Sequence, residues 1–179
     1  MNTLKVVRTL AAFVAIGSAA LAADSGPFNP SRVDVWFSPS GGCTEACVAA
    51  IDGAKKTIYV QAYSFTSAPI AQALVNARTR GVAVKLILDK SQKTEHYSEA
   101  DFAAHAGIPV WIDSKHAIAH NKIMVIDEAV VITGSFNFTK AAESNNAENM
   151  LVIHDKALAH RYLTNWEEHL AHSDVYAPR

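Results

Sequence analysis

Apolar and polar positions follow two rhythms along the chain, one typical of strands and one typical of helices. Short runs rich in Val, Ile and aromatic residues predict strands over residues 33–37, 57–65, 82–88, 109–112, 120–126, 130–133 and 148–153. Apolar residues at helical spacing predict helices over residues 44–56, 69–80, 95–106 and 156–171. Because strands alternate with helices early and two strands adjoin later, we expect an α/β fold, a mixed β-sheet flanked by helices.

The first residues have the pattern of a secretory signal peptide. Lys5 and Arg8 precede an uncharged stretch, and Ala20 and Ala22 form a small-x-small cleavage pattern. A membrane anchor is the alternative, but about 15 uncharged residues fall short of the roughly 20 that span a bilayer. We therefore predict that residues 1–22 are removed. The remaining residues 23–179 are then a single domain in the periplasm or the medium, with no stable membrane association.

Composition excludes a disordered chain, because half of the residues are apolar and only 18% are charged. The formal net charge of −1 gives no global attraction to a polyanion, so such a ligand would need a local basic patch. Five basic residues are candidates for that patch: Arg78, Arg80, Lys85, Lys90 and Lys93. They either line a groove or form a solvated face, and the sequence leaves both interpretations open.

Two cysteines, Cys43 and Cys47, lie four positions apart in the segment GGCTEAC. A location outside the cytoplasm permits disulfides, and Cα atoms at this spacing on a helix are about 6 Å apart, near the upper limit for a bridge. We predict a disulfide between them; the alternative is a pair of small buried thiols at the start of a helix. A zinc site is not expected here, because no matching ligand pair stands nearby at a usual spacing.

The stretch over residues 120–149 carries a set of polar residues suited to chemistry. In chain order these are His120, Lys122, Asp127, Gly134, Ser135, Asn137 and Glu148. On a strand, His120 and Lys122 point to the same face, about 6.5–7 Å apart. A lysine offers a cation to phosphate oxygens, and an imidazole acts as nucleophile, acid or base near neutral pH. This pair therefore indicates a site for a phosphoryl group.

The residues that follow this pair complete the predicted site. Gly134, at the end of the next strand, lets the backbone approach a ligand closely, and Ser135 and Asn137 add neutral donors. A carboxylate such as Glu148 is suited to hold one imidazole nitrogen of His120 and fix its tautomer. Ser135 is not expected to be a hydrolase nucleophile, because the Gly-x-Ser-x-Gly elbow is absent.

His-x-Lys-x4-Asp followed by Gly-Ser-x-Asn resembles the signature of the phospholipase D superfamily. GSFNFTKAAE with its downstream Glu-Asn is similar to the small, single-motif bacterial members, the EDTA-resistant endonucleases, as are AYSFTSAPIAQAL and GVAVKLILD. The resemblance covers roughly residues 33–170. It implies a phospholipase D/nuclease-like sandwich and a metal-independent phosphodiesterase, a non-specific endonuclease on DNA, with RNA left open.

The same resemblance implies roles for the site residues. His120 attacks phosphorus to form a covalent phosphohistidine, or protonates the leaving oxygen. Lys122 and Asn137 bind the phosphate, Ser135 supports them, and Glu148 orients the histidine. No metal and no cofactor are required for this chemistry.

The implied reaction needs two histidines, whereas the chain has one complete motif. A second copy of His120 is therefore expected from an identical subunit across a twofold axis. The expected partners are a nucleic-acid substrate and a second copy in a homodimer that shares one active site. Asp127 corresponds to the motif aspartate, which organises the site without contacting substrate. Two alternatives stay open: a phospholipase D-type lipid phosphodiesterase, and a non-catalytic nucleic-acid-binding member.

No metal site is predicted anywhere in the chain. His116 and His120 have the spacing of a ligand pair on a helix, but on an extended segment they would lie about 13 Å apart and could not share an ion. The remaining histidines of the central and C-terminal segments are interpreted as surface or core residues: His96, His105, His160, His169 and His172.

Overall fold

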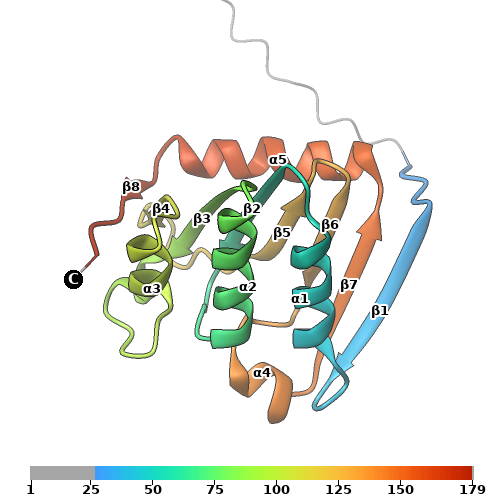
Figure 1. Ribbon diagram of the computed structural model, residues 1–179, viewed down its shortest axis with the longest axis horizontal. Helices are drawn as coiled ribbons and strands as arrows, with labels where there is room; N and C mark the ends of the chain where they lie inside the picture. The colour runs from blue at the N-terminus through green and yellow to red at the C-terminus, as the bar shows by residue number, and fades with distance from the viewer. Residues whose placement is uncertain (1–26, 179) are drawn as a thin grey trace, which may run out of the picture.

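The computed structural model describes residues 27–178, so the predicted signal peptide over residues 1–22 lies outside the described residues. An eight-stranded sheet dominates the fold, in the order β1-β7-β6-β5-β2-β3-β4-β8 (Figure 1). The strands are β1 Arg32–Ser38, β2 Thr57–Ala62, β3 Ala83–Asp89, β4 Val110–Asp113, β5 Lys122–Ile126, β6 Val130–Gly134, β7 Glu148–His154 and β8 Asp174–Val175. The helices are α1 Cys43–Gly53, α2 Ala68–Thr79, α3 Ala100–His105, α4 Lys140–Ser144 and α5 Lys156–Leu170, with a 3₁₀ turn, η1, over Lys90–Lys93. The predicted α/β fold with a mixed sheet flanked by helices is confirmed.

The sheet is mixed because its two halves are built differently. β2, β3 and β4 are parallel, whereas β5, β6, β7 and β1 form a run of antiparallel neighbours. β5 therefore starts, β6 ends and β7 starts at the same end of the sheet, with Lys122, Gly134 and Glu148 as their terminal residues. Helix α4 connects β6 to β7 at this end, at the bottom of Figure 1, and we call it the α4 end.

Helices cover the two faces of the sheet and bury its central strands. Every residue of β5 is buried, so this strand is a continuous apolar run after Lys122 rather than an alternating one. Met124 belongs to the core beneath α1 and α2, and its neighbour Val125 to the core beneath α5. Trp166 of α5 fills the second core, and its indole Nε1 donates to the carbonyl oxygen of Val60 at 2.9 Å. Within residues 27–178, no helix is both long enough and apolar enough to cross a bilayer.

The structure differs from the predicted elements where side chains take over backbone hydrogen bonds. The helix expected over 95–106 is reduced to α3. The 3₁₀ turn η1 precedes α3, and Asp89 caps η1 by accepting the N–H of Ser91. Gln92 of η1 accepts the N–H of Phe65, which ends the strand expected to run to that residue. α4 was not predicted; Thr139 begins it by accepting the N–H of Ala142 at 3.0 Å.

The predicted disulfide is not present, and the alternative of two buried thiols describes the structure. Cys43 and Cys47 are free and fully buried on the inner side of α1. Cys47 Sγ lies 3.3 Å from Met150 Sδ, so it packs into the core rather than toward Cys43. Burial raises the pKa of both thiols, that of Cys43 to about 11 with Glu143 and Glu45 adding to the effect, so both stay protonated near neutral pH.

Candidate active site

Five of the six residues predicted to act in chemistry meet in one open cavity of about 370 Å³ at the α4 end. Its lining residues are His120, Lys122, Gly134, Ser135, Asn137 and Glu148. They come from the start of β5, the end of β6 and the start of β7, the three strand ends that the antiparallel pairing brings together. The cavity has polar side chains and one glycine on its walls, which suits a charged ligand.

His120 and Lys122 form the centre of this cavity. Lys122 is buried, and its Nζ donates to the carbonyl oxygen of His120 at 2.8 Å and lies 3.0 Å from the imidazole Nδ1. The ring of Tyr63 packs against both, with its centroid 4.6 Å from that of the imidazole and 5.2 Å from Nζ. Burial lowers the pKa of Lys122, and the negative charge of Glu148 partly opposes that shift. The result is a desolvated ammonium group beside an exposed imidazole.

The backbone on both sides of His120 is held by the neighbouring strands. Asp89, at the end of β3, is buried and accepts the N–H of Ala119 at 2.7 Å. The carbonyl oxygen of Asn121 accepts the N–H of Tyr63 at 2.8 Å. These two anchors fix the chain immediately before and after the imidazole.

The opposite wall is built on close backbone packing between β6 and β7. The N–H groups of Ser135 and Phe136 both donate to the carbonyl oxygen of Asn149, and Ser135 Oγ accepts the N–H of Asn149. A Cβ at Gly134 would clash with that same carbonyl oxygen, so the approach requires glycine. Asn137 Oδ1 is buried and has no hydrogen-bond partner among the described residues, which leaves it available to a ligand or a second chain.

Glu148 lies in the cavity but does not make the bond expected from the sequence. Its Oε1 accepts from Asn146 Nδ2 at 3.1 Å, and the imidazole of His120, one nitrogen of which it was expected to hold, has its Nδ1 facing Lys122. In this structure the carboxylate therefore acts on the site through its charge, which favours the ammonium form of Lys122.

Asp127 is the one predicted residue outside the cavity. It follows β5 at the far end of the sheet, where its φ of 51° places it in the left-handed region. Its carboxylate accepts the N–H groups of Lys55, Lys56 and Thr57 at 2.7–3.0 Å. Burial opposes ionisation, but these bonds prevail and lower its pKa. Asp127 thus connects the turn between α1 and β2 to the hairpin of β5 and β6, whose first strand follows His120.

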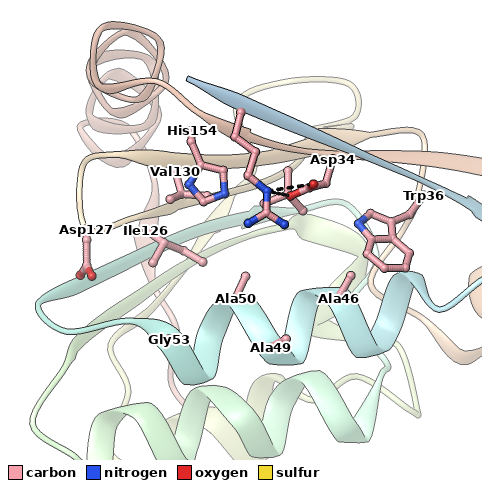
Figure 2. A pocket seen from close by; sticks show the side chains of 12 residues that line it. Asp34, Trp36, Ala46, Ala49, Ala50, Gly53, Ile126, Asp127, Val130 and His154 are labelled. Atoms are coloured by element: carbon pink, nitrogen blue, oxygen red, sulfur yellow. Dashed lines mark hydrogen bonds and ion pairs between the residues drawn. The ribbon is translucent and has the colours of Figure 1, made fainter. Parts of the chain in front are cut away.

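A second cavity, of about 380 Å³, lies at that far end and holds none of the other predicted residues. Figure 2 shows Ala46 and Ala50 of α1 pointing across it toward Asp34, Trp36 and His154 of β1 and β7. Small side chains on the helix leave this space. Its mostly apolar lining distinguishes it from the cavity around His120.

The basic residues singled out in the sequence do not form one groove. Arg80 precedes β3 and binds the backbone of α1, while Lys90 and Lys93 follow β3 at the α4 end. The strand between them spans about 23 Å. The α4 end also carries the exposed Lys115 and Lys140, so four exposed lysines lie at the end that holds the cavity, besides the buried Lys122.

Several residues of interest were missed by the sequence analysis. Tyr63 and Asp89 sit in strand-like runs whose local pattern says nothing about their contact with the imidazole segment. A cluster of possible metal ligands also formed from residues that were interpreted separately: Asp113, His116, His169 and His172. Short D-x-x-H and H-x-x-H spacings were the available signal for that cluster.

Comparison with known proteins places these features in a family. A family model described as cardiolipin synthase, PLD-like domain, matches residues 47–170. A protein named phospholipase D from Rickettsia felis is 47% identical over 136 residues, which are 76% of this chain and 68% of that protein. Mitochondrial cardiolipin hydrolase from Mus musculus is 29% identical over 141 residues, 79% of this chain and 64% of that protein.

Comparison of the fold with solved structures supports membership of the same family. A phospholipase D family member, Nuc from Salmonella typhimurium, superposes with a TM-score of 0.78 and 42% identity, covering 81% of this chain and 97% of that one. The family model spans more than half of the chain, and the residues of the signature other than Asp127 line one cavity. The chain therefore belongs to the phospholipase D superfamily and is a phosphodiesterase of that family.

Proposed function

We propose that this protein is a metal-independent endonuclease that cleaves phosphodiester bonds of DNA, with RNA as a second substrate class, through a phosphohistidine on His120. The observation that carries the proposal is the exposed imidazole beside the buried ammonium of Lys122, in an open cavity whose lining side chains are all polar. A buried cation stabilises the charge that develops on a phosphoryl group far better than one in water. Asn137 supplies a further polar group on the opposite wall.

The reaction on this geometry runs in two balanced steps. His120 Nε2 attacks phosphorus, because Nδ1 faces Lys122, and the P–N bond forms as the P–O ester bond breaks. The leaving oxygen takes a proton from a second imidazole, supplied by the partner subunit's His120. That imidazole then deprotonates a water molecule, which attacks phosphorus and releases His120. No redox change and no metal enter either step.

The need for a second imidazole supports a homodimer. His120 is the only histidine that lines the cavity among the described residues. The edge strand β1 also presents Val33, Val35 and Phe37 on one face, with exposed fractions of 44%, 52% and 64%. β1 pairs with β7, the strand that begins with Glu148 of the cavity, and the strip lies on the face of the sheet opposite to that of the Glu148 side chain. Such a strip on a soluble domain is typical of a protein contact.

Charge reversal on this strip tests the dimer. We expect Phe37→Lys to convert the protein to a monomer in sedimentation velocity and to abolish cleavage, since each half-site then lacks its second imidazole. Phe102→Lys, at an exposed aromatic residue on α3, is the control and should leave both properties unchanged. A Phe37→Lys monomer that still cleaves at wild-type rate would contradict the shared site.

A lipid phosphodiesterase is the second candidate. Relatives at 47% identity are named phospholipase D, and a more distant one is named a cardiolipin hydrolase. Ile118, two residues before His120, is 55% exposed and would meet an acyl chain near the headgroup. The polar walls of the cavity and the four lysines at the α4 end favour a polyanionic nucleic acid instead.

Parallel assays of the two substrates decide between them. We expect the purified protein to nick supercoiled plasmid in excess EDTA, with a rate that falls steeply as salt rises, and to release no headgroup from phosphatidylcholine or cardiolipin vesicles. Headgroup release without nicking would replace the nuclease by the lipid enzyme. Plasmid binding with neither activity would identify a non-catalytic member.

We also propose that residues 1–22 direct export and are removed, which places the nuclease in the periplasm or the medium. N-terminal sequencing of the protein recovered from each fraction tests this location.

A further inference from the structure

A cluster of four metal-ligating side chains lies outside the cavity that holds His120. Asp113 ends β4, His116 follows it in the next loop, His169 lies in the last turn of α5, and His172 follows that helix. One ligand atom from each residue falls within 4.8 Å of every other. Segments that are 56 residues apart in sequence thus bring three imidazoles to one carboxylate.

The imidazoles converge on a single oxygen atom. Asp113 Oδ2 lies 2.7 Å from His169 Nδ1, 3.2 Å from His116 Nδ1 and 3.4 Å from His172 Nε2. The other oxygen, Oδ1, accepts the backbone N–H of Lys115 at 3.1 Å, which orients the carboxylate. Tetrahedral zinc with bonds of 2.0–2.1 Å has ligand–ligand edges of about 3.3 Å. The distances from Oδ2 to His116 and His172 are close to that edge, whereas the 2.7 Å to His169 is a hydrogen-bond length that would lengthen when a metal ion binds.

Hydrogen bonding alone leaves this cluster unsatisfied. Asp113 is completely buried and forms hydrogen bonds with two of the imidazoles: His169 Nδ1 reaches Oδ2, and His116 Nδ1 lies 3.2 Å from Oδ2 and 3.3 Å from Oδ1. His172 Nε2 is buried and, among the described residues, makes no hydrogen bond despite its distance to Oδ2. A buried nitrogen that has no hydrogen-bond partner and lies close to a buried carboxylate oxygen is suited to bind a metal ion.

We propose that Asp113, His116, His169 and His172 bind one divalent transition-metal ion, with zinc the best match to three imidazoles and one carboxylate. All four positions of a tetrahedron are filled by protein groups, which makes the site structural rather than catalytic. The ion would join β4, the loop that leads to His120, and the end of α5. It is separate from the nuclease chemistry, since His120 is not part of the cluster.

Metal loading of the purified protein tests this site directly. We expect about one zinc ion per chain by elemental analysis after dialysis against zinc, and an intense visible spectrum typical of tetrahedral coordination when cobalt(II) replaces it. Zinc at about a hundredfold excess over Kd should raise the melting temperature of the metal-free protein by roughly 5–10 °C.

Single substitutions identify the ligands. His172→Gln and His169→Gln should weaken zinc binding by on the order of a hundredfold and remove the zinc-dependent rise in melting temperature. His160→Gln, on the exposed side of α5, is the matched control and should bind zinc like the wild type. His172 lies beyond the end of the helix, so its substitution is compatible with folding, and the wild-type titration needs no substitution at all.

The outcomes separate this site from the proposed function. A wild-type protein that binds no zinc or cobalt, and whose melting temperature ignores both, overturns the proposal and leaves a hydrogen-bonded cluster. Cleavage is a different readout: measured well below the melting temperature of the metal-free protein, it should persist in EDTA and in His172→Gln. Loss of cleavage with intact zinc binding would count against the nuclease and not against the metal site.

Discussion

His120→Ala is expected to reduce plasmid cleavage by on the order of 10⁴-fold or more, because it removes both the nucleophile and, in the dimer, the acid. Its imidazole is exposed and makes its one side-chain hydrogen bond, among the described residues, to Lys122. The substitution should therefore leave folding intact. Initial rates of nicking in excess EDTA, with melting temperatures measured in parallel, check the result.

Two controls make this result specific to the mechanism. His160→Ala, at an exposed histidine on α5, should cleave like the wild type. Wild-type protein quenched in alkali during turnover of a radiolabelled substrate should carry label on His120, since phosphohistidine survives alkali and is lost in acid. A folded His120→Ala protein with more than about a tenth of wild-type activity would contradict the phosphohistidine, as would label on another residue.

The local pattern of apolar and polar residues was sufficient to predict the two strands, β5 and β6, that position most of the candidate active site. Apolar runs of period two, closed by polar turns, predicted the hairpin of β5 and β6, and with it the approach of His120 and Lys122 to the end of β6. Spacing along one strand does not depend on the rest of the fold. This is why the hairpin brings His120 and Lys122 to the end of β6, and why Asp127 lies where β5 ends. Glu148 joins the cavity through the pairing of β7 with β6.

Contacts between distant segments could not be read in the same way. His169 meets Asp113 because α5 crosses the sheet and ends above β4, which depends on how Trp166 is seated in the core. Instead of the expected bond between His120 and Glu148, His120 Nδ1 contacts Lys122 Nζ, because the ammonium group of Lys122 is buried beside it. The predicted disulfide was wrong for a related reason: Cys47 packs against Met150 of β7.

The zinc proposal and the metal-free mechanism are compatible because they concern different parts of the α4 end. In one subunit, the cavity that carries chemistry contains one carboxylate and one imidazole, fewer than the three protein ligands of a typical catalytic zinc site. The four-ligand cluster is closed and lies on the segment that precedes His120. A metal ion there would stabilise the segment that leads to His120. Chelation should therefore lower the melting temperature before it lowers the rate of cleavage.

Lys122→Met is expected to have the second-largest effect, a loss of roughly 10²–10³ in kcat with little change in stability. Methionine matches the length and shape of the lysine stem but carries no charge. Burial of an ammonium group opposes folding, so its removal should leave the melting temperature equal to that of the wild type or slightly higher. A loss of activity at unchanged stability would then be due to the loss of the positive charge beside the phosphoryl group. Lys55→Met, at the far end of the sheet, is the control and should leave kcat unchanged.

The pH dependence gives this prediction a second test. Because burial lowers the pKa of Lys122, raising the pH removes the cation before an ordinary lysine would lose its proton. The rate should therefore fall on the alkaline side at a pH below the usual lysine value of about 10.4. Lys122→Arg retains a charge throughout this range, so its rate, although lower, should show no such fall. An alkaline fall that is the same in wild type and Lys122→Arg would assign it to another group and remove Lys122 from the charge-stabilising role.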